Sequence, residues 1–158
     1  MKTAIFYGST TGVTEEISRK VANILHADIF PVIEISKVKE YDFIILASST
    51  WGMGELQDDW IEGIENLKTE NLTGKKVGFI GVGDQESFGD SFVDAIGIIY
   101  NEIKDQGIHL VGQTSTEGYS FRTSKGIIDG EFLGLIIDEN NQSELTETRI
   151  KKWIEKVR

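Results

Sequence analysis

The fold of this chain is decided by one stretch near its N-terminus, Ala4-Ile5-Phe6-Tyr7-Gly8-Ser9-Thr10-Thr11-Gly12-Val13-Thr14. The apolar residues that open it are typical of a buried strand, and the amphipathic segment that follows, from Glu15 to Leu25, is typical of a helix. A strand that passes directly into a helix leaves the first helical N–H groups without intrahelical partners, so they attract anions. Four hydroxyls lie within residues 9–14, and no Lys or Arg lies between Lys2 and Arg19. The stretch therefore predicts a monophosphate site made of neutral donors: Ser9, Thr10, Thr11, Gly12, Val13 and Thr14.

Composition limits the possible functions. A length of 158 residues, with 39% hydrophobic residues and one proline, predicts a single globular domain over residues 1–158. The absence of cysteine excludes disulfides, thiol catalysis and thiolate-bound metals, so a redox role would need an organic cofactor. The net charge of −10 argues against nucleic acid or an anionic membrane as a partner and favours a basic protein. We expect a cytoplasmic location, because no apolar run approaches the roughly 20 residues of a membrane span.

Apolar runs alternate with helix-period segments along the chain, a pattern typical of a parallel sheet covered on both faces. It predicts strands at residues 3–7, 28–33, 43–48, 76–82 and 108–113, and helices at 12–25, 59–68, 90–106 and 145–157. Segment 113–137 is interpreted as an insertion that splits the last strand. Open parallel sheets bind ligands at the carboxyl ends of their strands, so the segments after the first, third and fourth strands should share one site.

Two glycine-rich loops follow the third and fourth strands, and each carries an aromatic residue. Trp51 lies between Ser48-Ser49-Thr50 and Gly52-Met53-Gly54, where it either stacks on a flat ligand ring or folds back as a loop anchor. Phe88, in the loop 81–90, is placed to cover the opposite face of that ring. By contrast, we expect core positions for the tryptophans and surface positions for the histidines that lie elsewhere: Trp60, Trp153, His26 and His109.

These loops resemble those of the flavodoxin family. The resemblance rests on the phosphate loop 9–14, on Thr50-Trp51 running on to Gly54-Glu55-Leu56, and on Gly83-Asp84-Gln85. Three later stretches extend it over essentially the whole chain: Gly112-Gln113-Thr114-Ser115-Thr116, Gly118-Tyr119 and Asn141-Gln142. The interrupted fifth strand is similar to that of the long-chain subgroup.

The resemblance implies an α/β fold, a three-layer doubly wound sandwich whose five-stranded parallel sheet has the order 2-1-3-4-5 and an interrupted last strand. It implies non-covalent binding of flavin mononucleotide (FMN), with residues 9–14 on the phosphate. The further cofactor contacts that it implies are Ser49 and Thr50 beside the ribityl chain, Trp51 and Phe88 on the ring faces, Gly52, Met53 and Gly54 in the loop beside flavin N5, Gly83 and Asp84 at the pyrimidine edge, and Asn140 near the ribityl chain or ring edge. Compared with many relatives, Phe88 replaces a tyrosine, Ser49 a proline and Asn140 an aspartate.

In this interpretation the protein is an electron carrier, with neither catalytic residues nor a metal site. Its partners would be basic redox proteins, such as a flavodoxin/ferredoxin-NADP reductase and a low-potential donor or acceptor oxidoreductase, and it would act as a monomer. We expect the Gly52-Met53 peptide to accept a hydrogen bond from N5 only in reduced flavin. We also expect nearby carboxylates to disfavour full reduction by repulsion: Glu55, Asp58, Asp59, Asp84, Glu86 and Asp90.

Three other functions remain open at the level of sequence. An FMN-dependent NAD(P)H:quinone or nitro reductase would need nicotinamide to reach the flavin face, which Trp51 and Phe88 would obstruct. A phosphorylated receiver domain needs acidic residues where this chain has Tyr7-Gly8-Ser9 and Ser48-Ser49-Thr50. A non-binding structural domain would leave the three loops unexplained.

Overall fold

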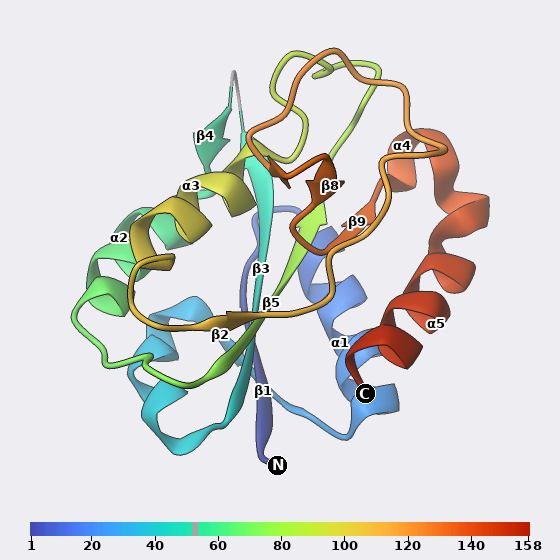
Figure 1. The fold of residues 1–158 in the computed structure, drawn as a ribbon. Helices are drawn as coiled ribbons and strands as arrows, with labels where there is room; N and C mark the ends of the chain where they lie inside the picture. The colour runs from blue at the N-terminus through green and yellow to red at the C-terminus, as the bar shows by residue number, and fades with distance from the viewer. Residues whose placement is uncertain (52–53) are drawn as a thin grey trace.

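The structure, a computed structural model, describes residues 1–51 and 54–158. Strands and helices alternate along the chain (Figure 1). The strands are β1 (Thr3–Gly8), β2 (Asp28–Pro31), β3 (Phe43–Trp51), β4 (Glu55–Leu56), β5 (Lys76–Val82), β6 (His109–Leu110), β7 (Ile127–Ile128), β8 (Glu131–Phe132) and β9 (Leu135–Ile137). The helices are α1 (Val13–Leu25), α2 (Asp58–Lys68), α3 (Asp94–Ile103), α4 (Glu139–Gln142) and α5 (Thr146–Val157), with 3₁₀ segments η1 (Val32–Glu40) and η2 (Ser143–Leu145).

The main sheet has the order β2-β1-β3-β5-β6, and its neighbouring strands are parallel. Strand β9 also pairs with β5, further along than β6: β6 lies beside Lys76 and Val77, and β9 lies beside residues 80–82. The fifth position of the sheet is therefore filled by two short pieces of strand. The predicted doubly wound sheet with an interrupted last strand is confirmed.

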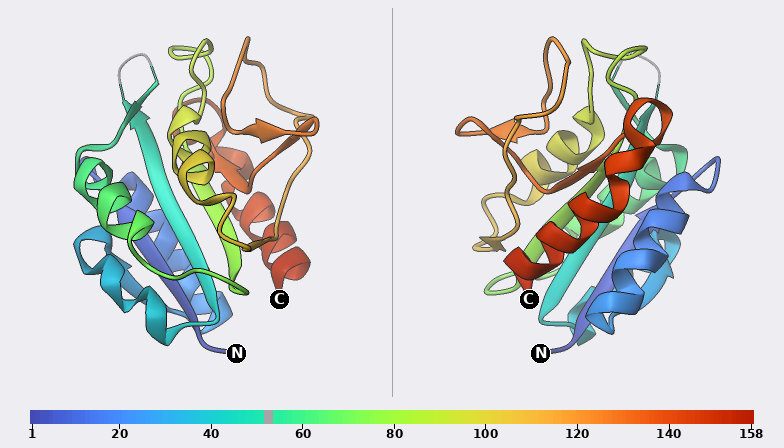
Figure 2. Two further views of the ribbon diagram at one scale, coloured as in Figure 1. Left: turned by 60° about the vertical axis from the view of Figure 1, so that its left-hand side comes forward. Right: turned by 90° about the vertical axis from the view of Figure 1, so that its right-hand side faces the viewer.

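Helices cover both faces of the sheet, with α1 and α5 on one face and η1, α2 and α3 on the other (Figure 2). Successive residues of β3 alternate between the two cores: Ile45 packs under α1 and α5, whereas Ile44 and Leu46 face the opposite layer. Trp60 and Trp153 are buried in different layers, and their indole N–H groups donate to the carbonyl oxygens of Ala47 and Gly112 at 2.8 and 2.9 Å. Their predicted core positions are confirmed.

Several predicted boundaries were wrong for local reasons. The second strand ends at Pro31, and the next segment is the 3₁₀ helix η1, whose buried residues Val32, Ile35 and Val38 recur every third position. The third helix begins only at Asp94, because Val93 has a φ of 49° and interrupts helical geometry. Of the strand predicted at 108–113, only His109–Leu110 forms.

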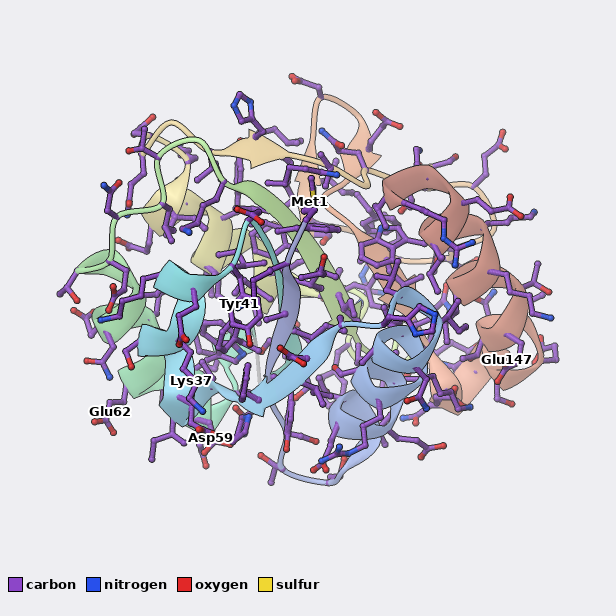
Figure 3. The ribbon with its side chains drawn as sticks, turned by 90° about the horizontal axis from the view of Figure 1, so that it is seen from below. Met1, Lys37, Tyr41, Asp59, Glu62 and Glu147 are labelled. Carbon is purple, nitrogen blue, oxygen red and sulfur yellow. The ribbon has the colours of Figure 1, made fainter. Side chains whose placement is uncertain are left out.

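Figure 3 shows the molecule from below, with the labelled Tyr41 and Glu147, which take part in two polar contacts between neighbouring elements. The Tyr41 hydroxyl donates to Asp28 Oδ2 at 2.6 Å, which joins the end of η1 to β2. Lys20 Nζ lies 3.0 Å from Glu147 Oε1, which joins α1 to α5. As expected, His26 and His109 are exposed. Among the described residues, no helix has the length and apolar character needed to cross a membrane.

Candidate functional site

A cavity of about 170 Å³ lies where the carboxyl ends of the strands meet. Its lining comes from the end of β3, from the end of β5 and the loop after it, and from the segments that follow β1 and β9, so four chain segments far apart in sequence converge there. The residues that line it are Thr11, Val13, Thr14, Ser49, Thr50, Val82, Gly83, Asp84, Phe88, Glu139 and Asn140. The chain leaves β1 toward β2 on one side and β3 lies on the other, so this is the switch point of the sheet.

The first side of the cavity is the start of α1. Gly12 precedes the helix with a φ of 93°, a left-handed conformation that favours glycine, and its N–H donates to Ser9 Oγ at 3.0 Å. Among the described residues, nothing accepts a hydrogen bond from the N–H groups of Val13, Thr14 or Glu15. The helix therefore presents uncapped donors and the positive end of its dipole to the cavity, as an anion site requires.

Not every residue of the predicted phosphate loop lines the cavity. Thr11, Val13 and Thr14 do, whereas Ser9 is used in the turn and Thr10 Oγ1 accepts a hydrogen bond from Gln57 Nε2 at 3.0 Å. Gln57 is 1% exposed, and its Oε1 also accepts from the Asp59 N–H at the start of α2. This glutamine, which the sequence analysis did not single out, joins the loop after β3 to the phosphate loop.

The end of β3 provides Ser49 and Thr50. Thr50 Oγ1 accepts from the Ala95 N–H at 2.9 Å, which fixes the strand end against the first turn of α3. Gly54 is buried and does not line the cavity; its φ is 95°, and a Cβ there would meet Asp94 Oδ2 at 2.6 Å. The predictions for Gly52, Met53 and the Trp51 side chain lie outside the described part of the structure.

The second side of the cavity is built around Asp84. Its carboxylate accepts hydrogen bonds from the backbone N–H groups of Glu86 and Ser87 at 3.2 and 2.9 Å, and from Asn140 Nδ2 and Asn141 Nδ2 at 2.8 Å each. Burial alone would raise the pKa of the Asp84 carboxyl, but the hydrogen bonds from Ser87, Asn140 and Asn141 outweigh it and hold that pKa well below its usual range. Asp84 is therefore an anionic clamp between the loop after β5 and α4.

A second aspartate, missed from sequence, binds the same loop and the same asparagine as Asp84. Asp138 is 0% exposed and accepts from Gln85 N and Nε2 at 3.0 and 2.7 Å and from Asn141 N and Nδ2 at 3.0 and 2.9 Å. Gln85 Oε1 in turn accepts from the Ser120 N–H, so the inserted segment is tied to the same network. The sequence signal for this role was an aspartate directly after an apolar strand. Such an aspartate is often only the N-cap of the next helix, and Asp138 is also the N-cap of α4.

The remaining predicted residues are placed as follows. Phe88 lines the cavity with 49% of its surface exposed, although it is a large aromatic residue. Asp84 alone, of the six carboxylates expected near the flavin, lines the described part of the cavity, and Glu139 lines it without having been predicted. Asp90 is paired with the Arg122 guanidinium, which lowers its pKa. Within residues 1–51 and 54–158, no cluster of His, Asp and Glu has the arrangement of a metal site.

A parallel sheet with an uncapped, hydroxyl-rich helix start at its switch point defines the class of doubly wound α/β proteins that bind a phosphorylated ligand. Within this class, the chain belongs to the flavodoxin family, whose sequence model matches residues 5–153. It is 41% identical to the flavodoxin of Haemophilus influenzae, covering 97% of this chain and 91% of the relative, and 40% identical to flavodoxin 1 of Escherichia coli K12, covering 98% and 92%. The crystal structure of Fusobacterium nucleatum flavodoxin bound to flavin mononucleotide superimposes with a TM-score of 0.93 at 33% identity, over 99% of this chain and 97% of that one.

Flavodoxins are electron carriers rather than enzymes, and they serve as redox partners of oxidoreductases. The prediction that this chain is an electron-transfer protein is thereby confirmed, and the reductase alternative is not favoured.

Proposed function

We propose that this protein binds FMN non-covalently in the cavity at the carboxyl edge of the sheet and carries single electrons on it between redox proteins. The observation that carries the proposal is the convergence of the α1 start, the β3 end, the loop after β5 and α4 on that one cavity. The family relationship, and the FMN in the solved Fusobacterium nucleatum flavodoxin, support the choice of ligand.

The residues fit the parts of FMN by their chemistry. The phosphate would be held by the uncapped N–H groups at the start of α1 and by the hydroxyls of Thr11 and Thr14, with no cation among the described lining residues. Ser49 and Thr50 would lie beside the ribityl chain, and the half-exposed Phe88 ring would cover one face of the isoalloxazine. Bound FMN supplies the one-electron chemistry.

The pyrimidine edge would meet the clamped loop. Gly83 and Asp84 line the cavity, and the Asp84 carboxylate is already engaged by two asparagine amides, so the loop is held in place whether or not a ligand is bound. Asn140 would therefore act on FMN mainly by fixing that loop. The roles of Trp51 as the second stacking ring, of Gly52 and Met53 beside N5, and of Gly54 in the same loop stay predictions.

The absorption spectrum of the purified protein tests the cofactor assignment. We expect a yellow protein whose FMN is released by denaturation, and an apoprotein that takes up added FMN more tightly than riboflavin, because riboflavin lacks the phosphate. A colourless protein whose apo form binds neither flavin would overturn the proposal. Stepwise reduction should then show a one-electron-reduced state, and we expect Gly52→Val to lower its yield.

We propose basic redox proteins as partners, such as a flavodoxin/ferredoxin-NADP reductase and a low-potential donor or acceptor oxidoreductase, with this chain acting as a monomer. The support is the net charge of −10 together with carboxylates exposed beside the cavity or on α2: Glu55, Asp58, Asp59, Glu62 and Glu86. A charged surface of this kind accelerates encounter with an oppositely charged partner. The bimolecular rate of electron transfer should therefore fall as salt is added; a rate independent of salt would contradict electrostatic docking. The cytoplasmic location stays a prediction.

An assay without partners separates carrier from reductase. We expect the purified FMN-loaded protein alone to show negligible steady-state oxidation of NADH or NADPH with a quinone or nitro compound. Substantial turnover in that assay would contradict the carrier assignment.

A further inference from the structure

A second cleft, of about 440 Å³, lies between α5, β9 and the segment 113–119. In the right-hand view of Figure 2 α5 runs diagonally along this flank of the molecule. In the described part of the chain, no residue lines both this cleft and the cavity at the strand ends. Its lining is Thr114, Ser115, Glu117, Tyr119, Leu135, Ile136, Arg149, Lys152, Trp153 and Lys156.

Three cations enter this cleft from one helix. Arg149, Lys152 and Lys156 are spaced i, i+3 and i+7 along α5, so they share the face that packs against segment 113–119. Trp153, on the same face, is buried and forms part of the floor. The first and last cations are separated by about 10 Å along the helix axis, given a rise of about 1.5 Å per residue.

Two of these cations are held by contacts to the facing segment. The Arg149 guanidinium lies 4.0 Å from the centre of the Tyr119 ring, and its Nη2 is 3.5 Å from the Gly118 carbonyl oxygen. Lys156 Nζ donates to the Gln113 carbonyl oxygen. Tyr119 is itself fixed, because its hydroxyl donates to the Ile136 carbonyl oxygen at 2.6 Å, and burial raises its pKa to about 12, so it stays a neutral donor. The positions of both charges are therefore set before any ligand arrives.

Among residues 1–51 and 54–158, the cleft cations form no ion pair with a carboxylate. Of the 13 other Lys and Arg residues in the described part of the chain, five form an ion pair with a carboxylate: Arg19, Lys20, Lys37, Lys68 and Arg122. Within that same part of the chain no carboxylate lies within 4.0 Å of the cleft cations, although acidic residues outnumber basic ones by 26 to 16.

The lining itself is also net positive. Glu117 is the one acid in the described lining, against three cations.

We propose that this cleft binds a small phosphorylated polyanion, one whose anionic groups are spread enough to meet cations along two turns of α5. A diphosphate group has that chemistry, because it carries several oxygens that accept from Arg and Lys. The hydroxyl of Ser115 accepts from the Glu117 N–H at 3.0 Å and keeps its own proton to donate. The site differs in kind from the cavity at the strand ends, whose described lining contains no Lys or Arg.

Calorimetric titration of the FMN-loaded protein tests the site, with the flavin spectrum recorded alongside to show that the cofactor stays in place. Inorganic pyrophosphate should bind saturably at matched ionic strength, and more tightly than orthophosphate. ADP is a second probe that distinguishes two sources of the ligand. If ADP and pyrophosphate bind equally tightly, the ligand is free pyrophosphate; if ADP binds more tightly, the ligand is an organic diphosphate. Both results support the site. Absence of saturable heat with pyrophosphate would overturn it.

Three matched variants locate the binding on the helix face. Lys152→Gln should weaken pyrophosphate binding at least about 5-fold, whereas Lys151→Gln, the same charge change at the adjacent exposed position, should leave it unchanged. Glu117→Gln should tighten binding, because it removes the acid from the lining. If the Lys151 and Lys152 variants weaken pyrophosphate binding equally, the effect comes from the overall charge of the protein and the proposal is overturned.

Discussion

The two sides of the cavity at the carboxyl edge of the sheet use polar groups in opposite ways. On the α1 side, the N–H groups of Val13 and Thr14 have no acceptor among the described residues. On the opposite side, the carboxylates of Asp84 and Asp138 each accept four hydrogen bonds from the protein. Polar groups without a hydrogen-bond partner in the protein are available to a ligand, and polar groups whose hydrogen bonds are all made within the protein hold the framework. Variants on the first side should therefore change binding, and variants on the second should change stability.

The largest effect is expected for Asp138→Asn. The substitution sets an amide NH₂ among four N–H donors inside the protein, so donors face donors and one or more lose their acceptor. We expect a loss of about 3 kcal/mol in the free energy of unfolding, measured by urea denaturation of the apoprotein.

The exposed Asp105→Asn is the matched control for that variant and should stay within about 0.5 kcal/mol of the parent. Equal stabilities of the two variants would show that the buried network does not hold the loop.

Thr14→Val tests the open side. Thr14 is 2% exposed and lines the cavity, and valine keeps its shape while removing the hydroxyl. Because hydrogen bonds to charged groups are strong, we expect the FMN Kd to rise about 10- to 100-fold. Riboflavin serves as the internal control, since its Kd should change by less than about 2-fold. An equal loss of affinity for FMN and riboflavin would show that Thr14 does not contact the phosphate.

The sequence predicted the elements of the fold that have a clear local pattern. The buried strands β1, β3 and β5 each contain an apolar run, and they form within a few residues of their predicted bounds. The segment Val32–Glu40 was missed because its apolar residues recur every third position, which fits neither strand nor α-helix periodicity. The start of α3 depends on the left-handed conformation of Val93, which no local sequence pattern predicts.

For the site, the sequence predicted residues that line the cavity better than residues that hold its framework. The hydroxyl-rich start of α1 is a local motif, and Thr11 and Thr14 line the cavity as expected. Gln57 and Asp138 act through hydrogen bonds to residues 47 and 53 positions away in the chain, so their roles depend on tertiary structure alone.

Asn140→Asp should weaken the clamp at neutral pH. In the parent, Asn140 Nδ2 donates to Asp84 Oδ2 at 2.8 Å, and an aspartate there would place two carboxylates in contact. We expect a loss of about 1 to 2 kcal/mol at pH 7. Since the Asp84 pKa is depressed in the folded protein, the stability that Asp84 contributes is present above its unfolded pKa of about 4 and is lost as pH falls below it.

The stability difference between parent and variant should therefore shrink as the pH falls through about 4. Urea denaturation at a series of pH values checks this, and a constant difference from pH 7 to pH 3 would contradict the ionic origin.

The smallest effect is expected at Asp94, a buried carboxylate with fewer donors than Asp138. It accepts from the Lys125 N–H at 2.7 Å and lies beside Gly54. Burial raises its pKa, and the Lys125 hydrogen bond only partly opposes this. A raised carboxyl pKa means that ionisation disfavours the folded state, so the penalty is present at pH 7 and disappears as pH falls below the unfolded pKa of about 4.

Asp94→Asn removes that charge and keeps an oxygen for the Lys125 N–H. It should raise the free energy of unfolding at pH 7 by less than about 1 kcal/mol, a gain that vanishes at pH 3. Asp94→Ala, which leaves the Lys125 N–H without its acceptor, should instead be less stable than the parent at both pH values. A loss of stability in the asparagine variant at pH 7 would mean that the Asp94 charge is satisfied as fully as that of Asp138. The number of hydrogen bonds that a carboxylate accepts would then no longer predict whether the protein tolerates its neutralisation.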